Sequence, residues 1–387
     1  MVFCMSSLFF SSPLSREELI ARKRPRENDI RGAFFRDTTA IIHSNPFRRL
    51  KHKTQVFFTP ENDHICTRIE HVMHVASVAA TICRSLNLDA DLAWAIGLGH
   101  DLGHTPFGHV GEKIIEEIQG TPFAHELYSL RVVDKLINHG RGLNLTYAVR
   151  DGIINHCGER FEQAIVPDFE LKELTAIDAR DRYPSSWEGC VVRMSDKIAY
   201  LGRDFEDAVK LRMLSRDSLP AEVTKILGNS NGEIIDTMVM DLIQTSLKAG
   251  SIGFSKPVYE ALLSFKEFNY RQIYKHDLLA EYYTYFRRIL FALFDYLLGL
   301  YERFGSEAEA YLAEGNTLAA RFGEYLVKMD EMYAGEEADG RSRVIDYLAG
   351  MTDDFALASV SEIMVPKRFE SKFDQLIFAR RREFDSR

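Results

Sequence analysis

The chain has 387 residues, of which 46% are hydrophobic, so it can form one large domain or two to three ordinary domains around a sizeable core. Its 48 basic and 57 acidic residues give a net charge of −9, which does not support nucleic acid as a partner. Five cysteines without a C-x-x-C spacing indicate a reducing compartment and no zinc-finger framework. Because no apolar run approaches the ~20 residues that a membrane span needs, we expect a cytoplasmic protein without a membrane partner.

Helical periodicity dominates the chain, whereas alternating strand patterns are scarce, which predicts an all-α fold. Between residues 65 and 86 apolar side chains recur at spacings of three and four. This spacing predicts an amphipathic helix, which we expect to stop at Asn87. Asp89 is a suitable N-cap for the next helix, so the two helices should form a hairpin.

Thr121 and Pro122 are expected to begin a third helix, with Thr121 as its cap and the proline at its first position, and Gly140 is expected to end it. The stretch 157–186 is rich in Asp, Glu and Pro, which predicts an insertion or a substrate-access loop. Later helices are predicted at residues 171–176, 191–214, 221–227, 234–249, 258–265, 276–304, 307–333 and 341–348.

Ionisable side chains follow directly on an apolar run in the second helix of the hairpin. His100 and Asp101 come after residues 92–98, and burying such groups beside a core is costly unless a cation or a substrate compensates. On the first helix His71 lies at the flank of the apolar stripe, whereas His74 falls opposite and is expected at the surface.

The hairpin brings the two histidines to comparable heights. At about 1.5 Å per residue, His71 and His100 lie roughly 24 and 17 Å from the turn, in helices whose axes are roughly 8–10 Å apart. The two imidazoles can therefore converge with Asp101. Oxygen and imidazole ligands suit Mg, Mn or Fe better than a thiolate-binding metal, so the sequence predicts a divalent metal site.

A fourth ligand is offered much later in the chain. Asp196, Tyr200 and Asp204 follow at i, i+4 and i+8, which places them on one face of a predicted helix. Such a face is either the wall of a half-buried pocket or a solvated acidic surface, and the spacing alone leaves both open.

Together these motifs resemble the HD-domain superfamily, and within it the deoxynucleoside triphosphate triphosphohydrolases, including the dGTPase-like enzymes. The general signature is a His, a His-Asp pair and a distant Asp, which match His71, His100-Asp101 and Asp196. The narrower resemblance extends from about residue 31 to 355 and rests on residues 45–50, 53–57, 68–71, 100–112, 196–200 and 346–353.

The resemblance implies an HD-type, multi-helix catalytic core over residues 31–215, preceded by a partly disordered extension at 1–30. A helical region at 216–387 would complete the substrate pocket and supply contacts for a homo-oligomer, a tetramer or a hexamer. His71, His100, Asp101 and Asp196 would bind the divalent metal.

The resemblance also assigns catalytic roles. His109 and Glu112 look like the catalytic pair, and their i, i+3 spacing lets the carboxylate orient the imidazole. His104 would contact phosphate and is counted with these catalytic residues.

Substrate contacts are implied at six further positions. Arg68 and Lys197 would clamp phosphates, and His125 would contact the triphosphate. The remaining contacts concern the sugar: Gln55 and Asp204 would hold its 3′-hydroxyl, and Tyr200 would exclude a 2′-hydroxyl.

The implied reaction is hydrolysis of dGTP or several dNTPs to deoxynucleoside and inorganic triphosphate. Two alternatives stay open: an HD-type phosphodiesterase or alarmone hydrolase on the same metal scaffold, and a catalytically silent nucleotide sensor. Whether an effector nucleotide binds as a second ligand is also open, as are the base preference and the native metal.

Overall fold

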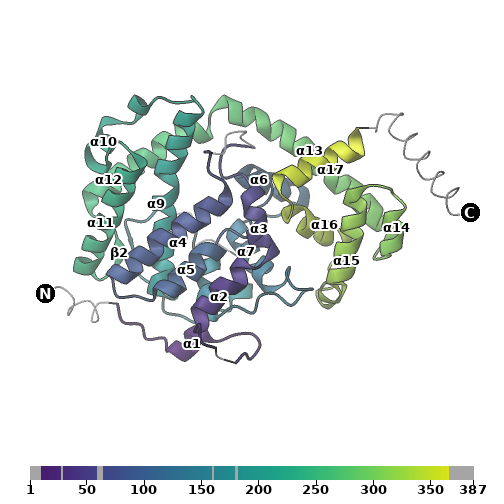
Figure 1. The fold of residues 1–387 in the computed structure, drawn as a ribbon, viewed down its shortest axis with the longest axis horizontal. Coiled ribbons are helices and arrows are strands. Elements are labelled where there is room, and N and C mark those ends of the chain that lie inside the picture. The colour runs from purple at the N-terminus through teal and green to yellow at the C-terminus, as the bar shows by residue number, and fades with distance from the viewer. Residues whose placement is uncertain (1–9, 28, 59–63, 159–160, 179–181, 366–387) are drawn as a thin grey trace, which may run out of the picture.

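A computed structural model describes residues 10–27, 29–58, 64–158, 161–178 and 182–365. Helices dominate these residues, and the strands β1 (Ala164–Ile165) and β2 (Ile252–Gly253) form a minimal antiparallel pair, which confirms the all-α prediction. Figure 1 shows two groups of helices, with the long α13 (Asp277–Phe304) running from one group to the other.

The other helices are, in chain order, α1 (Arg16–Ile20), α2 (Ala33–Ile42), α3 (Asn45–Arg49), α4 (Arg68–Ser85), α5 (Ala90–Gly99), α6 (Gly108–Gln119), α7 (His125–Asp134), α8 (Tyr147–Ile154), α9 (Trp187–Lys210), α10 (Ala221–Leu227), α11 (Asn231–Ala249), α12 (Lys256–Asn269), α14 (Ala308–Leu312), α15 (Thr317–Gly335), α16 (Gly340–Ala349) and α17 (Asp353–Met364).

The predicted hairpin is formed by α4 and α5. Thr67 and Glu70 form a capping box at the start of α4, and Asp89 caps α5 as predicted, with its side chain accepting from the backbone of Leu92. The helices approach closely at Gly97, which has no side chain. A Cβ atom added there would lie 2.6 Å from the Cα atom of Ala76. The small side chains at this crossing fix the two helices that carry the candidate ligands.

The loop that follows α5 contributes to two hydrophobic clusters, through Leu102 in the first and Phe107 in the second. The first cluster includes buried side chains of α4, α5, α8 and α9, and the second includes buried side chains of α13, α15 and α16. Helix α6 joins the second cluster through Ile114 and Ile115, both fully buried. Asp353 accepts hydrogen bonds from the backbone of Phe107 and Thr54, so the C-terminal helices help to position the loop before α6.

The predicted third helix was wrong in its bounds. Helix α7 begins only at His125, after Ala124 as N-cap, and it ends at Asp134. The chain cannot continue as a helix to Gly140 because Asn138 and His139 adopt left-handed backbone conformations. Helix α6, just before this segment, was not predicted.

Three further sequence expectations need correction. The helix predicted at 307–333 is split into α14 and α15, because Gly315 turns left-handed and Asn316 caps the second helix. At 171–176 only a 3₁₀ turn, Leu174–Ala176, is present. His74 is half-buried rather than at the surface, and burial lowers its pKa.

Within the part of the chain that the structure describes, no helix is both long and apolar enough to span a membrane.

Gly103 is required by the close approach of α7 to the loop after α5. A Cβ atom added there would lie 2.2 Å from the backbone nitrogen of Ser129 and 2.6 Å from the carbonyl oxygen of His125. We therefore expect Gly103→Ala to lower the free energy of unfolding by about 1–3 kcal/mol, measured by urea denaturation. The matched control is Gly232→Ala in α11, where an added Cβ meets nothing within 4 Å and stability should be unchanged or slightly higher.

Candidate functional site

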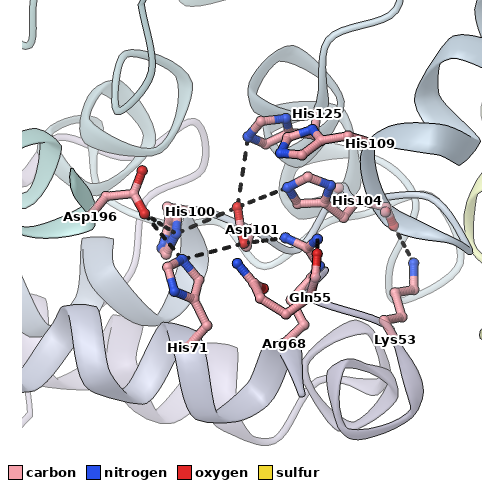
Figure 2. Close-up of polar contacts among 12 residues, drawn as sticks. Lys53, Gln55, Arg68, His71, His100, Asp101, His104, His109, His125 and Asp196 are labelled. Atoms are coloured by element: carbon pink, nitrogen blue, oxygen red, sulfur yellow. Dashed lines mark hydrogen bonds and ion pairs between the residues drawn. The ribbon is translucent and has the colours of Figure 1, made fainter. Parts of the chain in front are cut away.

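Side chains from three helical segments converge in the interior. His71 projects from α4, His100 and Asp101 follow α5, and Asp196 projects from α9 (Figure 2). The Nε2 atom of His71 lies 3.1 Å from Oδ1 of Asp196, and the Nε2 atom of His100 lies 3.4 Å from Oδ1 of Asp101 and 4.0 Å from Oδ1 of Asp196. The structure thus brings together all four residues that the sequence analysis predicted as metal ligands.

The donor atoms of this cluster fit a divalent cation. His100 donates from Nδ1 to the carbonyl oxygen of Gly97 over 2.7 Å, which leaves its Nε2 atom with a lone pair. That buried Nε2 has no hydrogen-bond partner and faces two carboxylates. Burial alone would raise the pKa of Asp196, but the hydrogen bond and charge of His71 hold it well below its usual range. A cation would satisfy the lone pair and both carboxylates.

Asp101 is also paired with an arginine. The Nη1 atom of Arg68 lies 2.6 Å from Oδ2 of Asp101, and the two side chains are 1% and 4% exposed. Burial opposes ionisation of Asp101, but His104, His100 and Arg68 together keep its pKa well below the ordinary value. Arg68 is further held by the carbonyl oxygen of Thr54, so its position is fixed by three segments of the chain.

The carboxylate of Glu112 on α6 lies within ion-pair distance of three histidines. Its Oε1 atom lies 2.7 Å from Nδ1 of His104, 3.1 Å from Nδ1 of His109 and 3.3 Å from Nδ1 of His125. Burial alone would raise the pKa of Glu112, but the three histidines lower it far below the usual value. His104 and His125 are buried and stacked at 3.8 Å, whereas the side chain of His109 is 68% exposed. Of the three imidazoles, His109 is therefore the most accessible from solvent.

Comparison with known proteins identifies the family of the chain. Residues 68–201 match the HD domain, and residues 252–362 match the phosphohydrolase-associated domain. A deoxyguanosinetriphosphate triphosphohydrolase-like protein of Caldanaerobacter subterraneus is 39% identical over 95% of this chain and 95% of its own length. Proteins with the same name from Desulfatibacillum aliphaticivorans and Clostridium tetani are 37% and 36% identical over 92% and 89% of this chain, and over 94% and 89% of their own lengths.

The chain belongs to the deoxyguanosinetriphosphate triphosphohydrolase-like family of HD-domain proteins. The family resemblance expected from the sequence is confirmed. Membership also makes the chain a phosphohydrolase, and the HD domain implies a divalent metal cofactor.

Among the substrate residues expected for this family, Lys197 is engaged elsewhere in the structure. Its Nζ atom lies 2.8 Å from Oε2 of Glu162 and 4.5 Å from the centre of the Phe161 ring. Glu162 also pairs with the buried Arg193. To meet a phosphate, Lys197 would have to exchange its bond to Glu162 for one to the ligand.

The three residues expected at the sugar lie on α9 and on the segment before α4. Tyr200 is half-buried on α9, one turn from both Asp196 and Asp204. Asp204 accepts a hydrogen bond from the hydroxyl of Tyr274, which the sequence analysis did not single out. The Oε1 atom of Gln55 is buried without a hydrogen-bond partner, and Figure 2 shows this side chain beside Arg68 and His71.

Asp204 makes stability depend on pH. Burial raises its pKa from 3.8 to about 7, against the opposing hydrogen bond from Tyr274. The unfolded carboxyl ionises near 3.8, so the cost of burying the carboxylate is fully present above pH 7 and disappears as the pH falls towards 4. We expect Asp204→Asn to raise the free energy of unfolding by up to about 4 kcal/mol at pH 8 and by much less at pH 5. Urea denaturation at both pH values measures this, and an equal gain at both would contradict it.

The sequence analysis missed His156 and Cys157, which follow α8. His156 is 1% exposed and donates from Nδ1 to the carbonyl oxygen of Ile153 over 2.7 Å. A usable signal was present, because His156 follows an apolar helix end just as His100 does. The buried Lys53, which donates to the carbonyl oxygen of His104, was included in a family motif but given no role.

Proposed function

We propose that the chain hydrolyses deoxynucleoside triphosphates to deoxynucleoside and inorganic triphosphate. The observation that carries the proposal is the convergence of two imidazoles and two carboxylates beside the three histidines that surround Glu112. The relatives match this chain over nearly their whole length. They are named deoxyguanosinetriphosphate triphosphohydrolase-like proteins, which supports the same substrate class.

His71, His100, Asp101 and Asp196 would hold the divalent ion, with Mg, Mn and Fe as the candidates that their donor atoms suit. When bound, the ion supplies Lewis-acid polarisation of a phosphoryl oxygen.

His109 is the proposed general acid. Water attacks the α-phosphorus and loses a proton to bulk solvent, the bond from that phosphorus to the 5′-oxygen breaks, and His109 donates a proton to the departing oxygen. Oε1 of Glu112 lies 3.1 Å from Nδ1 of His109, so Nε2 is the ring nitrogen that would face the departing oxygen. Such proton transfer is typically worth roughly 10² to 10⁴-fold in rate.

The triphosphate needs positive charge and hydrogen-bond donors along its length. Arg68 keeps N–H groups beyond those bound to Asp101, Thr54 and Gln55, because a guanidinium carries five donors. We assign phosphate contacts to Arg68, His104 and His125, and to Lys197 after it leaves Glu162.

The deoxyribose would lie between α9 and the segment before α4. Gln55 offers a buried oxygen that has no partner, which suits it to accept from the 3′-hydroxyl. Asp204, whose pKa burial raises to about 7, would donate to the same hydroxyl oxygen in its protonated form. Tyr200 would lie against the sugar and leave no room for a 2′-hydroxyl, so selection against ribonucleotides would be steric.

The test is to incubate the purified protein with each dNTP and with Mg or Mn, and to resolve the products. We expect deoxynucleoside and intact triphosphate, and Asp196→Asn should lose both the bound ion and the turnover. Release of pyrophosphate or orthophosphate would contradict the assigned bond. Binding of dNTP without any turnover would instead support a nucleotide sensor.

A further inference from the structure

One carboxylate bridges two buried cations beside the candidate metal ligands. Oε1 of Glu162 lies 2.8 Å from Nη2 of Arg193, and Oε2 lies 2.8 Å from Nζ of Lys197. The three side chains are 11%, 2% and 9% exposed, in that order. Both cations project from α9, and Lys197 directly follows Asp196. Burial alone would raise the pKa of Glu162, but the hydrogen bond and charge of Lys197 and the charge of Arg193 lower it, so the carboxyl is ionised at neutral pH.

The two cations are held unequally. Arg193 also donates from Nη1 to three carbonyl oxygens at 2.8–3.1 Å, those of Asn155, Cys157 and Arg182. Its position therefore does not depend on Glu162 alone. Among the residues that the structure describes, Glu162 supplies the only oxygen acceptor of Lys197, whose other hydrogen-bond contact is the sulfur of Met194 at 4.0 Å. Lys197 is thus the cation that movement of one side chain can release.

The backbone that carries Glu162 is anchored on both sides. The hydroxyl of Tyr259 donates to the carbonyl oxygen of Phe161 over 2.6 Å. The backbone N–H of Phe254 donates to the carbonyl oxygen of Gln163 over 3.0 Å, and the chain then enters β1, which pairs with β2. Because the neighbours of Glu162 are fixed, its carboxylate is presented to α9 by a rigid segment, and side-chain rotation is enough to release Lys197.

Positive charge exceeds negative charge around this segment. Nζ of Lys266 lies 4.5 Å from the centre of the Phe161 ring, the same distance as Nζ of Lys197. Three cationic side chains thus meet residues 161 and 162, and Glu162 supplies one negative charge to them. A triphosphate carries several negative charges, so it can replace this single carboxylate as the partner of Lys197.

We propose, on the basis of the function proposed above, that the carboxylate of Glu162 competes with the phosphates of the substrate for Lys197 and holds the ammonium until a triphosphate displaces it. Glu162 is then a positioning residue that acts through Lys197. The contact spares the free protein a buried, unpaired ammonium, which would be costly. It also weakens substrate binding, because the bond from Lys197 to a phosphate replaces one that already exists.

Isothermal titration calorimetry with inorganic triphosphate tests this competition on the full-length protein with Mg²⁺. Glu162→Gln keeps the shape of the side chain and removes its charge, so we expect triphosphate to bind about 10- to 100-fold more tightly than to the wild type. The KM for a dNTP substrate should fall as well.

Glu206→Gln is the matched control. Glu206 also bridges an arginine and a lysine on α9, with Oε2 at 3.1 Å from Arg203 and 3.8 Å from Lys210. These three side chains are 31–34% exposed, so solvent already screens the pair. The affinity of Glu206→Gln for triphosphate should match that of the wild type.

The expected gain must pass through Lys197. Lys197→Met should weaken the binding of triphosphate, and adding Glu162→Gln to it should give no gain. If Glu162→Gln alone does not fold, Glu162→Asp decides, because it keeps a negative charge beside Arg193 but is one methylene shorter and holds Lys197 less well. It should bind triphosphate more tightly than the wild type, by a smaller factor than expected for the glutamine.

Equal or weaker binding of triphosphate to a folded Glu162→Gln would overturn the proposal and leave Glu162 as a structural partner of Arg193. A gain of the same size in the Lys197→Met background would overturn it too, because the effect would then be a general loss of negative charge. Failure of the proposed function is distinguishable from both. Tighter binding of triphosphate to Glu162→Gln, without hydrolysis of any dNTP by the wild type, would support the competition and refute the hydrolysis.

Discussion

Replacing His109 with glutamine should lower kcat by roughly 10² to 10⁴-fold while the protein stays folded. The side chain is 68% exposed, so its removal leaves no cavity and no unpaired group in the core. Its Nδ1 atom lies 3.1 Å from Glu112, which leaves Nε2 as the nitrogen that would donate a proton to the leaving oxygen. Because glutamine cannot transfer that proton near neutral pH, the loss should appear in kcat and only weakly in KM. Steady-state rates of dNTP hydrolysis and a thermal melt measure both effects.

The control for this prediction is His43→Gln, which removes an exposed imidazole at the end of α2. Its kcat should match the wild type. The pH profile adds a second readout, since removal of a general acid should flatten the alkaline fall in rate. If His109→Gln keeps the wild-type kcat and pH profile, the proton donor is another residue.

The α4–α5 hairpin could be predicted because its signals are local. The apolar stripe of α4 recurs every three or four residues, and Asp89 caps α5 from a neighbouring position in the chain. Helix α6 lacks such a signal at its start. Phe107 is its N-cap in a left-handed conformation without a side-chain cap, and the C-terminal helices hold it there through Asp353. A start fixed by tertiary contacts cannot be read from the neighbouring sequence.

The same distinction holds at the candidate site. The convergence of His71 and His100 could be predicted from helix geometry, because both residues lie on one hairpin. The pairing of Lys197 with Glu162 could not, because Glu162 lies in the long segment before α9, whose path depends on packing against the rest of the fold. His156 was missed for a related reason: α8 reaches the cluster through packing on α5 and α9, and no spacing in the sequence relates it to His125.

Replacing Arg68 with methionine should have the largest effect on stability of the changes considered. Arg68 and Asp101 are 1% and 4% exposed, and their Nη1 and Oδ2 atoms are 2.6 Å apart. Methionine fills part of the volume but leaves the carboxylate of Asp101 without its arginine partner. Breaking a buried ion pair in this way typically costs about 3–5 kcal/mol. Urea denaturation of the metal-free protein measures the expected loss in the free energy of unfolding.

The divalent ion of the proposed centre should reduce this loss. Because Asp101 is one of its ligands, a bound ion offsets the carboxylate that Arg68→Met leaves uncompensated. The gap in stability between variant and wild type should therefore be smaller with saturating Mn²⁺ than with a chelator. Activity should remain low in either case, because the guanidinium proposed to contact the phosphates is missing.

Arg271→Met is the matched control, because Arg271 pairs with Glu267 on the exposed face of α12 and the turn that follows it. Their side chains are 70% and 55% exposed, and an exposed pair of this kind contributes at most about 1 kcal/mol. If Arg68→Met is as stable as Arg271→Met without metal, the buried pair does not stabilise the fold. If Mn²⁺ leaves the gap unchanged, Asp101 does not bind the ion, because only an ion bound to that carboxylate can replace the charge of the lost arginine.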